Sequence, residues 1–134
     1  MASVFTKIID GELPCFKIYE NERIFSFLAL DQINMGHCLV IPKKEVNHFF
    51  DMEEKDYNEV FAFCKKLSKV IKTATDCKRV GLAAQGFEVQ HAHMHLIPLN
   101  DPSEFSFSKG VKRSDDEMKK MQQLLLTELE RENQ

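Results

Sequence analysis

The chain has 134 residues, and its 43% hydrophobic and 29% charged content is that of a globular domain rather than a disordered chain. This length suits one domain, which we take to span residues 1–134, and is too short for two full ones. The formal net charge of −3 argues against sequence-independent binding of nucleic acid. No stretch approaches the roughly 20 apolar residues that cross a bilayer, so no membrane partner is expected.

The four cysteines indicate a reducing compartment. They are widely separated and form no Cys-x-x-Cys pair of the kind that marks a structural zinc site or a redox dithiol. The first ten residues hold no long apolar segment typical of a secretory signal. We therefore expect a cytoplasmic protein.

The first part of the chain predicts a short helix followed by three strands. Apolar residues at helical spacing near the N-terminus predict a helix that ends at the Asp10-Gly11 turn. Residues 15–20 and 23–30 are rich in β-branched and aromatic types, and we expect them to pair as a hairpin. Residues 36–42 read as a short interior strand that is stopped by its final proline.

The remainder of the chain predicts two longer helices and two more strands. Apolar residues recur at three and four positions over 53–72, which is typical of a helix that packs on a core. Residues 79–84 predict a strand, 100–110 an irregular loop, and 114–129 a final helix that opens with a Ser-x-x-Glu capping box. The expected fold class is α+β, with about five mostly antiparallel strands and two main helices.

Three histidines at every second position are the most informative feature of the sequence. His91, His93 and His95 follow the period of an extended strand, so we expect their side chains to share one face. The apolar residues between them would then face the core. The segment therefore predicts a half-buried strand over 91–97 that presents a row of imidazoles.

Three interpretations of this row remain open from the residues alone. The first is a strand with a solvated polar face. The second is a metal site, but His91 and His95 start about 13 Å apart at a strand rise of ~3.3 Å, too far to share one zinc ion, so a two-histidine site needs another ligand. The third is nucleophilic catalysis, in which one neutral imidazole attacks while its neighbours orient it and donate hydrogen bonds. The isolated His48 is expected to be structural or at the surface.

Three segments in order resemble the histidine triad family of nucleotide-binding hydrolases and transferases. They are HAHMHLI at 91–97, FTKIIDGELP at 5–14 and GHCLVIPK at 36–43. The resemblance covers about residues 4–98 and leaves 99–134 as a loop and a C-terminal helix. It implies a homodimer whose sheets pair across the interface, and a purine nucleotide of the AMP or GMP type bound over the histidine strand.

The resemblance also implies a mechanism that requires no metal or other cofactor. By position, His93 is the nucleophile that attacks the α-phosphate and forms a covalent nucleotidyl intermediate. His95 would donate to the phosphoryl oxygens or the leaving group, and His91 would orient His93. His37 matches a further histidine that supports the same group.

The resemblance extends to the nucleoside pocket, where one residue departs from the family pattern. Phe5, Ile8 and Leu28 would line the base pocket; the alternative is that they belong to the hydrophobic core. Ala29 stands where many family members carry the aspartate that binds the ribose. Asp31 lies two residues further on and can replace it if the strand continues, because two residues along a strand return to the same face. The alternative is a solvent-exposed turn aspartate.

A second departure lies before the triad, where the family commonly has Gly-Gln-Ser/Thr-Val. Gly86, Glu88 and Val89 occupy this segment and would contact the substrate. A carboxylate at 88 beside a phosphate would be repulsive. We expect its side chain to turn away and its backbone N–H to contribute; the alternative is that Glu88 raises the pKa of a nearby histidine.

The sequence thus predicts an enzyme that hydrolyses nucleoside 5′-phosphoryl compounds, with a purine nucleoside phosphoramidate as the expected substrate type. Two alternatives stay open. One is a nucleotide-binding or regulatory module without turnover, which the residues at positions 29 and 88 allow. The other is a metal-dependent hydrolase.

Overall fold

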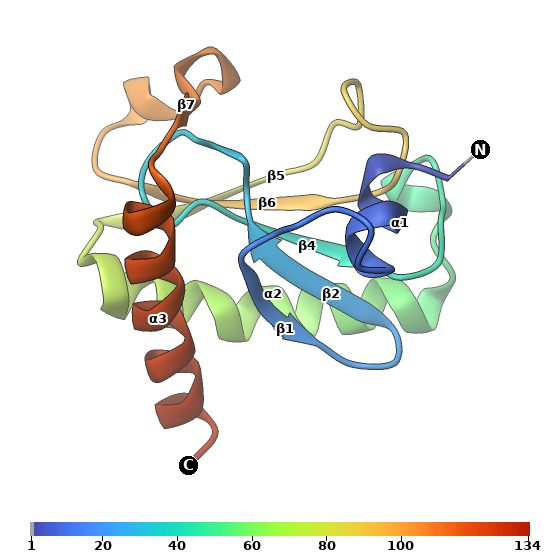
Figure 1. The fold of residues 1–134 in the computed structure, drawn as a ribbon, viewed down its shortest axis with the longest axis horizontal. Coiled ribbons are helices and arrows are strands. Elements are labelled where there is room, and N and C mark those ends of the chain that lie inside the picture. The colour runs from blue at the N-terminus through green and yellow to red at the C-terminus, as the bar shows by residue number, and fades with distance from the viewer. Residues whose placement is uncertain (1) are drawn as a thin grey trace.

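The computed structural model describes residues 2–134 and has an α+β fold (Figure 1). Five strands form one antiparallel sheet in the order β1-β2-β4-β6-β5. Their bounds are β1 Lys17–Glu20, β2 Ile24–Leu28, β4 Cys38–Pro42, β5 Arg79–Ala83 and β6 Met94–Leu99. The two main helices are α2 Glu54–Thr75 and α3 Asp115–Glu132, and a short helix α1 spans Val4–Ile9. The expected fold class is confirmed.

One face of the sheet packs against α2, which lies across it in Figure 1, and against α3. Leu28, Val40 and Leu96 point from neighbouring strands into this part of the core. They meet Leu67 of α2 and Leu125 of α3, both completely buried. The apolar stripes that predict the two helices therefore supply most of the hydrophobic core, which is the main source of stability in a domain of this size.

The other face of the sheet is covered by α1. Phe5 and Ile8 of this helix pack on Phe27 of β2 and Leu39 of β4. Ser3 caps the helix by accepting a hydrogen bond from the Thr6 backbone N–H at 3.0 Å. α1 therefore covers part of this face, and its Phe5 ring also contacts the rings of His91 and His93.

The histidine segment differs from the expected strand. β6 begins at Met94, and neither His91 nor His93 belongs to it. The last ladder pair with β4 joins Val40 and Met94. Beyond that pair, imidazole nitrogens bind to backbone carbonyl oxygens that a longer strand would use. The His91 ring donates a hydrogen bond to the Pro42 carbonyl, and the His93 ring donates one to the His91 carbonyl. The predicted half-buried strand over 91–97 is therefore confirmed for residues 94–97 and was wrong for residues 91–93.

A second, two-stranded sheet was not foreseen. β3 Asp31–Gln32 pairs antiparallel with β7 Val111–Lys112. The strand predicted over 23–30 ends at Leu28, and the loop over 100–110 holds two short 3-10 turns. In the described part of the chain, no helix is long and apolar enough to cross a bilayer. The pairing of sheets across a homodimer stays a prediction.

Candidate active site

A cleft opens on the α1 side of the sheet, beside the histidines. Its walls come from α1, from residues 29–33 after β2, from β4, from the loop before β6 and from the 3-10 turn Phe107–Lys109. His37, His93 and His95 all line it. His91 does not line it, because its ring is completely buried. The cleft therefore contains three of the four histidines expected at the site.

Hydrogen bonding fixes which nitrogen of His93 carries the proton. Its Nδ1 lies 2.7 Å from the backbone carbonyl oxygen of His91. A carbonyl oxygen only accepts hydrogen bonds, so Nδ1 must carry the hydrogen. In the neutral ring, Nε2 then keeps its lone pair. Burial lowers the pKa of His93, which favours this neutral form.

The same reasoning assigns His37 and His95 the opposite tautomer, with the hydrogen on Nε2. The backbone N–H of Ile33 donates to Nδ1 of His37 at 3.2 Å, so the hydrogen of His37 lies on Nε2. That Nε2–H donates to Nδ1 of His95 at 2.9 Å. His95 must therefore carry its own hydrogen on Nε2. This series of hydrogen bonds, from Ile33 through His37 to His95, leaves the Nε2–H of His95 available as a donor.

The Nε2 lone pair of His93 and the Nε2–H of His95 thus belong to neighbouring rings. The rings of His93 and His95 are 4.9 Å apart between centroids. Among residues 2–134, no side-chain nitrogen or oxygen that is fully shielded from solvent lacks a hydrogen-bond partner. The Nε2 atoms of His93 and His95 have no hydrogen-bond partner among these residues, so both are accessible to solvent. This pair suits nucleophilic attack at a phosphorus atom beside a donor to its oxygens.

Burial also keeps the supporting imidazoles neutral at physiological pH. It lowers the pKa of His37 to about 4. It lowers the pKa of His95 to about 3, with further contributions from the charged forms of His37 and His93. A neutral His95 cannot act as an imidazolium acid, but its Nε2–H can donate a hydrogen bond.

His37 is held by a buried glutamine that the sequence did not single out. The Gln32 side-chain oxygen accepts from the backbone N–H groups of Gly36, at 2.9 Å, and His37, at 3.1 Å. Its amide nitrogen donates to the carbonyls of Ala29, at 2.7 Å, and His37, at 2.8 Å. The whole side chain is buried. Gln32 therefore anchors the turn that leads His37 into β4.

Most of the residues expected to bind substrate line the cleft. Phe5, Ile8 and Val89 do so, and the Phe5 ring meets that of His93 at a centroid distance of 5.0 Å. Leu28 does not, and this expectation is corrected: alternation along β2 turns its side chain to the opposite face, into the core under α2. Gly86 lines a smaller neighbouring cavity.

The two acidic residues of interest both lie at the cleft. Asp31 is exposed and lines the cleft. It does not belong to a continuation of β2, which ends at Leu28, but is the first residue of β3. Ala29 lines the same cleft but has no side-chain acceptor. Glu88 also lines it, and its charge acts to raise the pKa of His93, more weakly than burial lowers it. The carboxylate therefore lies within electrostatic reach of His93, as the second option for Glu88 requires.

One wall of the cleft is formed by Phe107 and Gly110, which no sequence motif marks as functional. The Phe107 ring packs on His95, with centroids 4.6 Å apart. Gly110 approaches the base of Asp31 so closely that an added Cβ would lie 3.1 Å from the aspartate Cβ. These contacts join segments far apart in the chain, so no local pattern could reveal them.

Within residues 2–134, no group of three or more histidine, cysteine, aspartate or glutamate side chains is arranged to hold a metal ion. His37 and His95 use their facing nitrogens on each other.

Comparison with known proteins agrees with the geometry. A family model described as "HIT domain" matches residues 10–101. An uncharacterized HIT-like protein of Borreliella burgdorferi is 35% identical over 116 residues, covering 81% of this chain and 84% of that protein. Adenosine 5′-monophosphoramidase HNT1 of Saccharomyces cerevisiae is 34% identical over 102 residues, covering 75% of this chain and 64% of that protein.

Solved structures agree with the fold as well. The crystal structure of a hypothetical histidine triad nucleotide-binding protein from Sulfolobus tokodaii superposes with a TM-score of 0.85 at 27% identity, over 95% of this chain and 91% of that one. The match of the family model over more than half of the sequence, the relatives and the shared fold lead to one conclusion. The chain belongs to the histidine triad family.

Proposed function

We propose that this protein hydrolyses nucleoside 5′-phosphoryl conjugates, with a purine nucleoside phosphoramidate as its substrate type, through a covalent intermediate on His93. The observation that carries the proposal is the pair of accessible Nε2 atoms, one with a lone pair and one with a hydrogen. The name of the yeast relative, an adenosine 5′-monophosphoramidase, supports the choice of substrate.

The two chemical steps follow from that pair. In the first, Nε2 of His93 forms a bond to the α-phosphorus while the phosphorus–nitrogen bond to the amine breaks, and the departing nitrogen takes a proton from solvent. The ring gains positive charge, which the His91 carbonyl stabilises through Nδ1–H. In the second step water attacks phosphorus and releases a proton to solvent, the bond to Nε2 breaks with its electron pair returning to the ring, and the nucleoside monophosphate leaves. The Nε2–H of His95 donates to a phosphoryl oxygen in both steps.

His93 lines two cavities, and we use them to propose an orientation for the substrate. The apolar cleft that holds Phe5 and Ile8 suits a purine base, because such sites combine apolar walls with a few polar groups. A smaller cavity, lined by His48, Phe50 and Gly86, also reaches His93. We place the leaving group there, because the bond that breaks points away from the nucleoside. His48 would then line the leaving-group side instead of having only a structural role.

The test is hydrolysis of adenosine 5′-phosphoramidate by the wild-type protein. We expect AMP to be released, with turnover unchanged in excess chelator, and a mass increase of one adenylyl group after a rapid alkaline quench. Tight AMP binding without turnover or adduct would support the non-catalytic alternative instead. Turnover that disappears with chelator and returns with a divalent metal would support the metal-dependent one.

Asp31 offers a second, independent test. We propose that its carboxylate accepts hydrogen bonds from the ribose hydroxyls. Asp31 and Ala29 both line the cleft, but the side chain of Ala29 has no acceptor. Hydrogen bonds to a charged group contribute about 1.5–3 kcal/mol, so Asp31→Ala should raise KM about 10- to 100-fold with a smaller change in kcat. The matched control is a 2′,3′-dideoxy substrate, on which wild type and variant should be equal. A variant with the wild-type KM on the ribose substrate would show that Asp31 is only a turn residue.

A further inference from the structure

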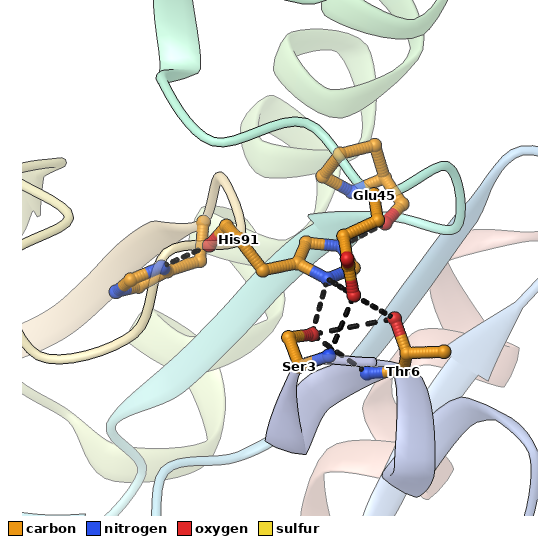
Figure 2. Close-up of polar contacts among 6 residues, drawn as sticks. Ser3, Thr6, Glu45 and His91 are labelled. Atoms are coloured by element: carbon orange, nitrogen blue, oxygen red, sulfur yellow. Dashed lines mark hydrogen bonds and ion pairs between the residues drawn. The ribbon is translucent and has the colours of Figure 1, made fainter. Parts of the chain in front are cut away.

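A network of polar groups surrounds the buried ring of His91 (Figure 2). Its Nε2 lies 2.8 Å from the carbonyl oxygen of Pro42, so Nε2 carries the hydrogen. Its Nδ1 lies 2.8 Å from the hydroxyl oxygen of Ser3. The His91 ring therefore connects the end of β4 to the residue that caps α1.

Glu45 completes this network from the segment after β4. Its Oε1 accepts the backbone N–H of Ser3 at 2.6 Å and the Thr6 hydroxyl at 2.7 Å. The same oxygen lies 4.0 Å from Nδ1 of His91. The two hydrogen bonds lower the pKa of Glu45 to about 2, so its side chain is a carboxylate at physiological pH.

The hydrogens in this network can be assigned without conflict. The Thr6 hydroxyl donates to Glu45, so the Ser3 hydroxyl hydrogen remains for His91. Ser3 Oγ lies closer to His91 Nδ1, at 2.8 Å, than to Thr6 Oγ1, at 3.3 Å, so it donates to the ring. Every hydrogen then has one acceptor. His91 is consequently held in a single tautomer and a single ring orientation.

The orientation of His91 matters because its backbone holds the proton of His93. The His91 carbonyl oxygen is the acceptor for Nδ1–H of His93 at 2.7 Å. Ring and carbonyl belong to one residue, and the next backbone N–H, that of Ala92, is fixed on the Val46 carbonyl at 2.7 Å. A ring that is fixed at both nitrogens therefore limits the positions that the carbonyl can take.

We propose that Ser3, Thr6 and Glu45 are positioning residues: they fix His91 so that its carbonyl keeps the proton of His93 on Nδ1 and leaves Nε2 free to attack. This inference rests on the proposed function of His93. None of the three lines the cleft, whereas their neighbours Val4 and Phe5 do. Their loss is therefore expected to lower the rate of attack rather than the affinity for the nucleotide.

The experiment compares Ser3→Ala and Glu45→Ala with two controls. Ser3→Thr keeps a hydroxyl at a position where threonine also caps helices. Glu53→Ala removes a carboxylate from the same stretch of chain, where it pairs only with Lys44 at the surface. Because small misplacements of reacting groups can cost about 100-fold in rate, we expect Ser3→Ala and Glu45→Ala to lower the single-turnover adenylylation rate roughly 10- to 100-fold, with KM within twofold. Ser3→Thr and Glu53→Ala should stay within twofold of wild type.

A spectroscopic measurement separates positioning from loss of folding or of activity. Ring ¹⁵N shifts of the histidines should show one Nδ1–H tautomer for His93 in wild type and in both controls. In Ser3→Ala and Glu45→Ala we expect a mixture of tautomers. An unchanged His93 tautomer in both variants would overturn the proposal, as would a rate within twofold of wild type. If wild type hydrolyses no phosphoramidate, the proposed function fails, and the tautomer of His93 still decides whether this network positions it.

Discussion

Replacing His93 should abolish turnover while nucleotide binding remains. His93→Ala removes the ring whose free nitrogen carries a lone pair in the cleft, so no adenylylated protein should form. Loss of a nucleophile in covalent catalysis typically costs about 10³-fold or more in kcat. We expect at least that loss with adenosine 5′-phosphoramidate, measured by AMP release. The affinity for AMP, measured by calorimetry, should change by less than tenfold, because the variant keeps the residues that we propose contact the base and the ribose.

A second variant distinguishes the nucleophile from a structural role. His93→Asn keeps a side-chain N–H that can donate to the His91 carbonyl, yet it has no imidazole lone pair. Both variants should therefore be inactive. Added imidazole should restore part of the turnover of His93→Gly, because the free ring can enter the space that is left. Turnover of His93→Asn at the wild-type rate would exclude His93 as the nucleophile.

Acidification should destabilise the protein before its carboxylates titrate. Burial lowers the pKa of His37 from 6.5 to about 4, and that of His95 to about 3. Between pH 6.5 and these values the unfolded state binds more protons than the folded state, so stability falls as the pH falls. For His37 alone this amounts to about 3 kcal/mol by pH 4, at about 1.4 kcal/mol for each pH unit. That is a large share of the ~5–15 kcal/mol that stabilises a typical domain.

Urea unfolding curves from pH 7.5 to pH 4 measure this effect. The free energy of unfolding should be constant above pH 7 and should decrease steadily below pH 6.5. The interval from pH 6.5 to pH 5 is diagnostic, because the carboxylates whose pKa values are lowered, such as Glu45, lose their contribution only below about pH 4.5. His37→Gln should reduce the slope in this interval, and the remaining slope should come from His95. A wild-type curve that is already flat between pH 6.5 and pH 5 would contradict the lowered pKa values.

Much of the architecture could be predicted from local patterns. The capping box from Ser114 to Glu117 marks the start of α3, and both of its reciprocal hydrogen bonds are formed. The apolar spacing that predicts α2 corresponds to a helix that buries Leu67 and Ile71. These features depend on residues three or four positions apart, which is why the sequence alone reveals them.

Strand orientation and the ends of strands were harder to predict. All five residues of β2 are buried, so the sequence shows no alternation that would assign Leu28 to one face or the other. The pairing with β4 and the covering helices decide it. The triad spacing likewise predicts a strand, yet the strand begins only at Met94, because ring nitrogens occupy the carbonyls of Pro42 and His91.

The period of the histidines marks a candidate site, and the resemblance of the neighbouring motifs to the histidine triad family directs attention to His93, His95 and His37. How each ring is used depends on the three-dimensional arrangement. A tautomer is set by the partner of the other nitrogen, and those partners are backbone groups or side chains brought together from distant positions, such as His37 for His95. The side chains of Ser3 and Glu45 meet at His91 for the same reason. Contacts across such separations arise from the packing of complete elements, which no short segment encodes.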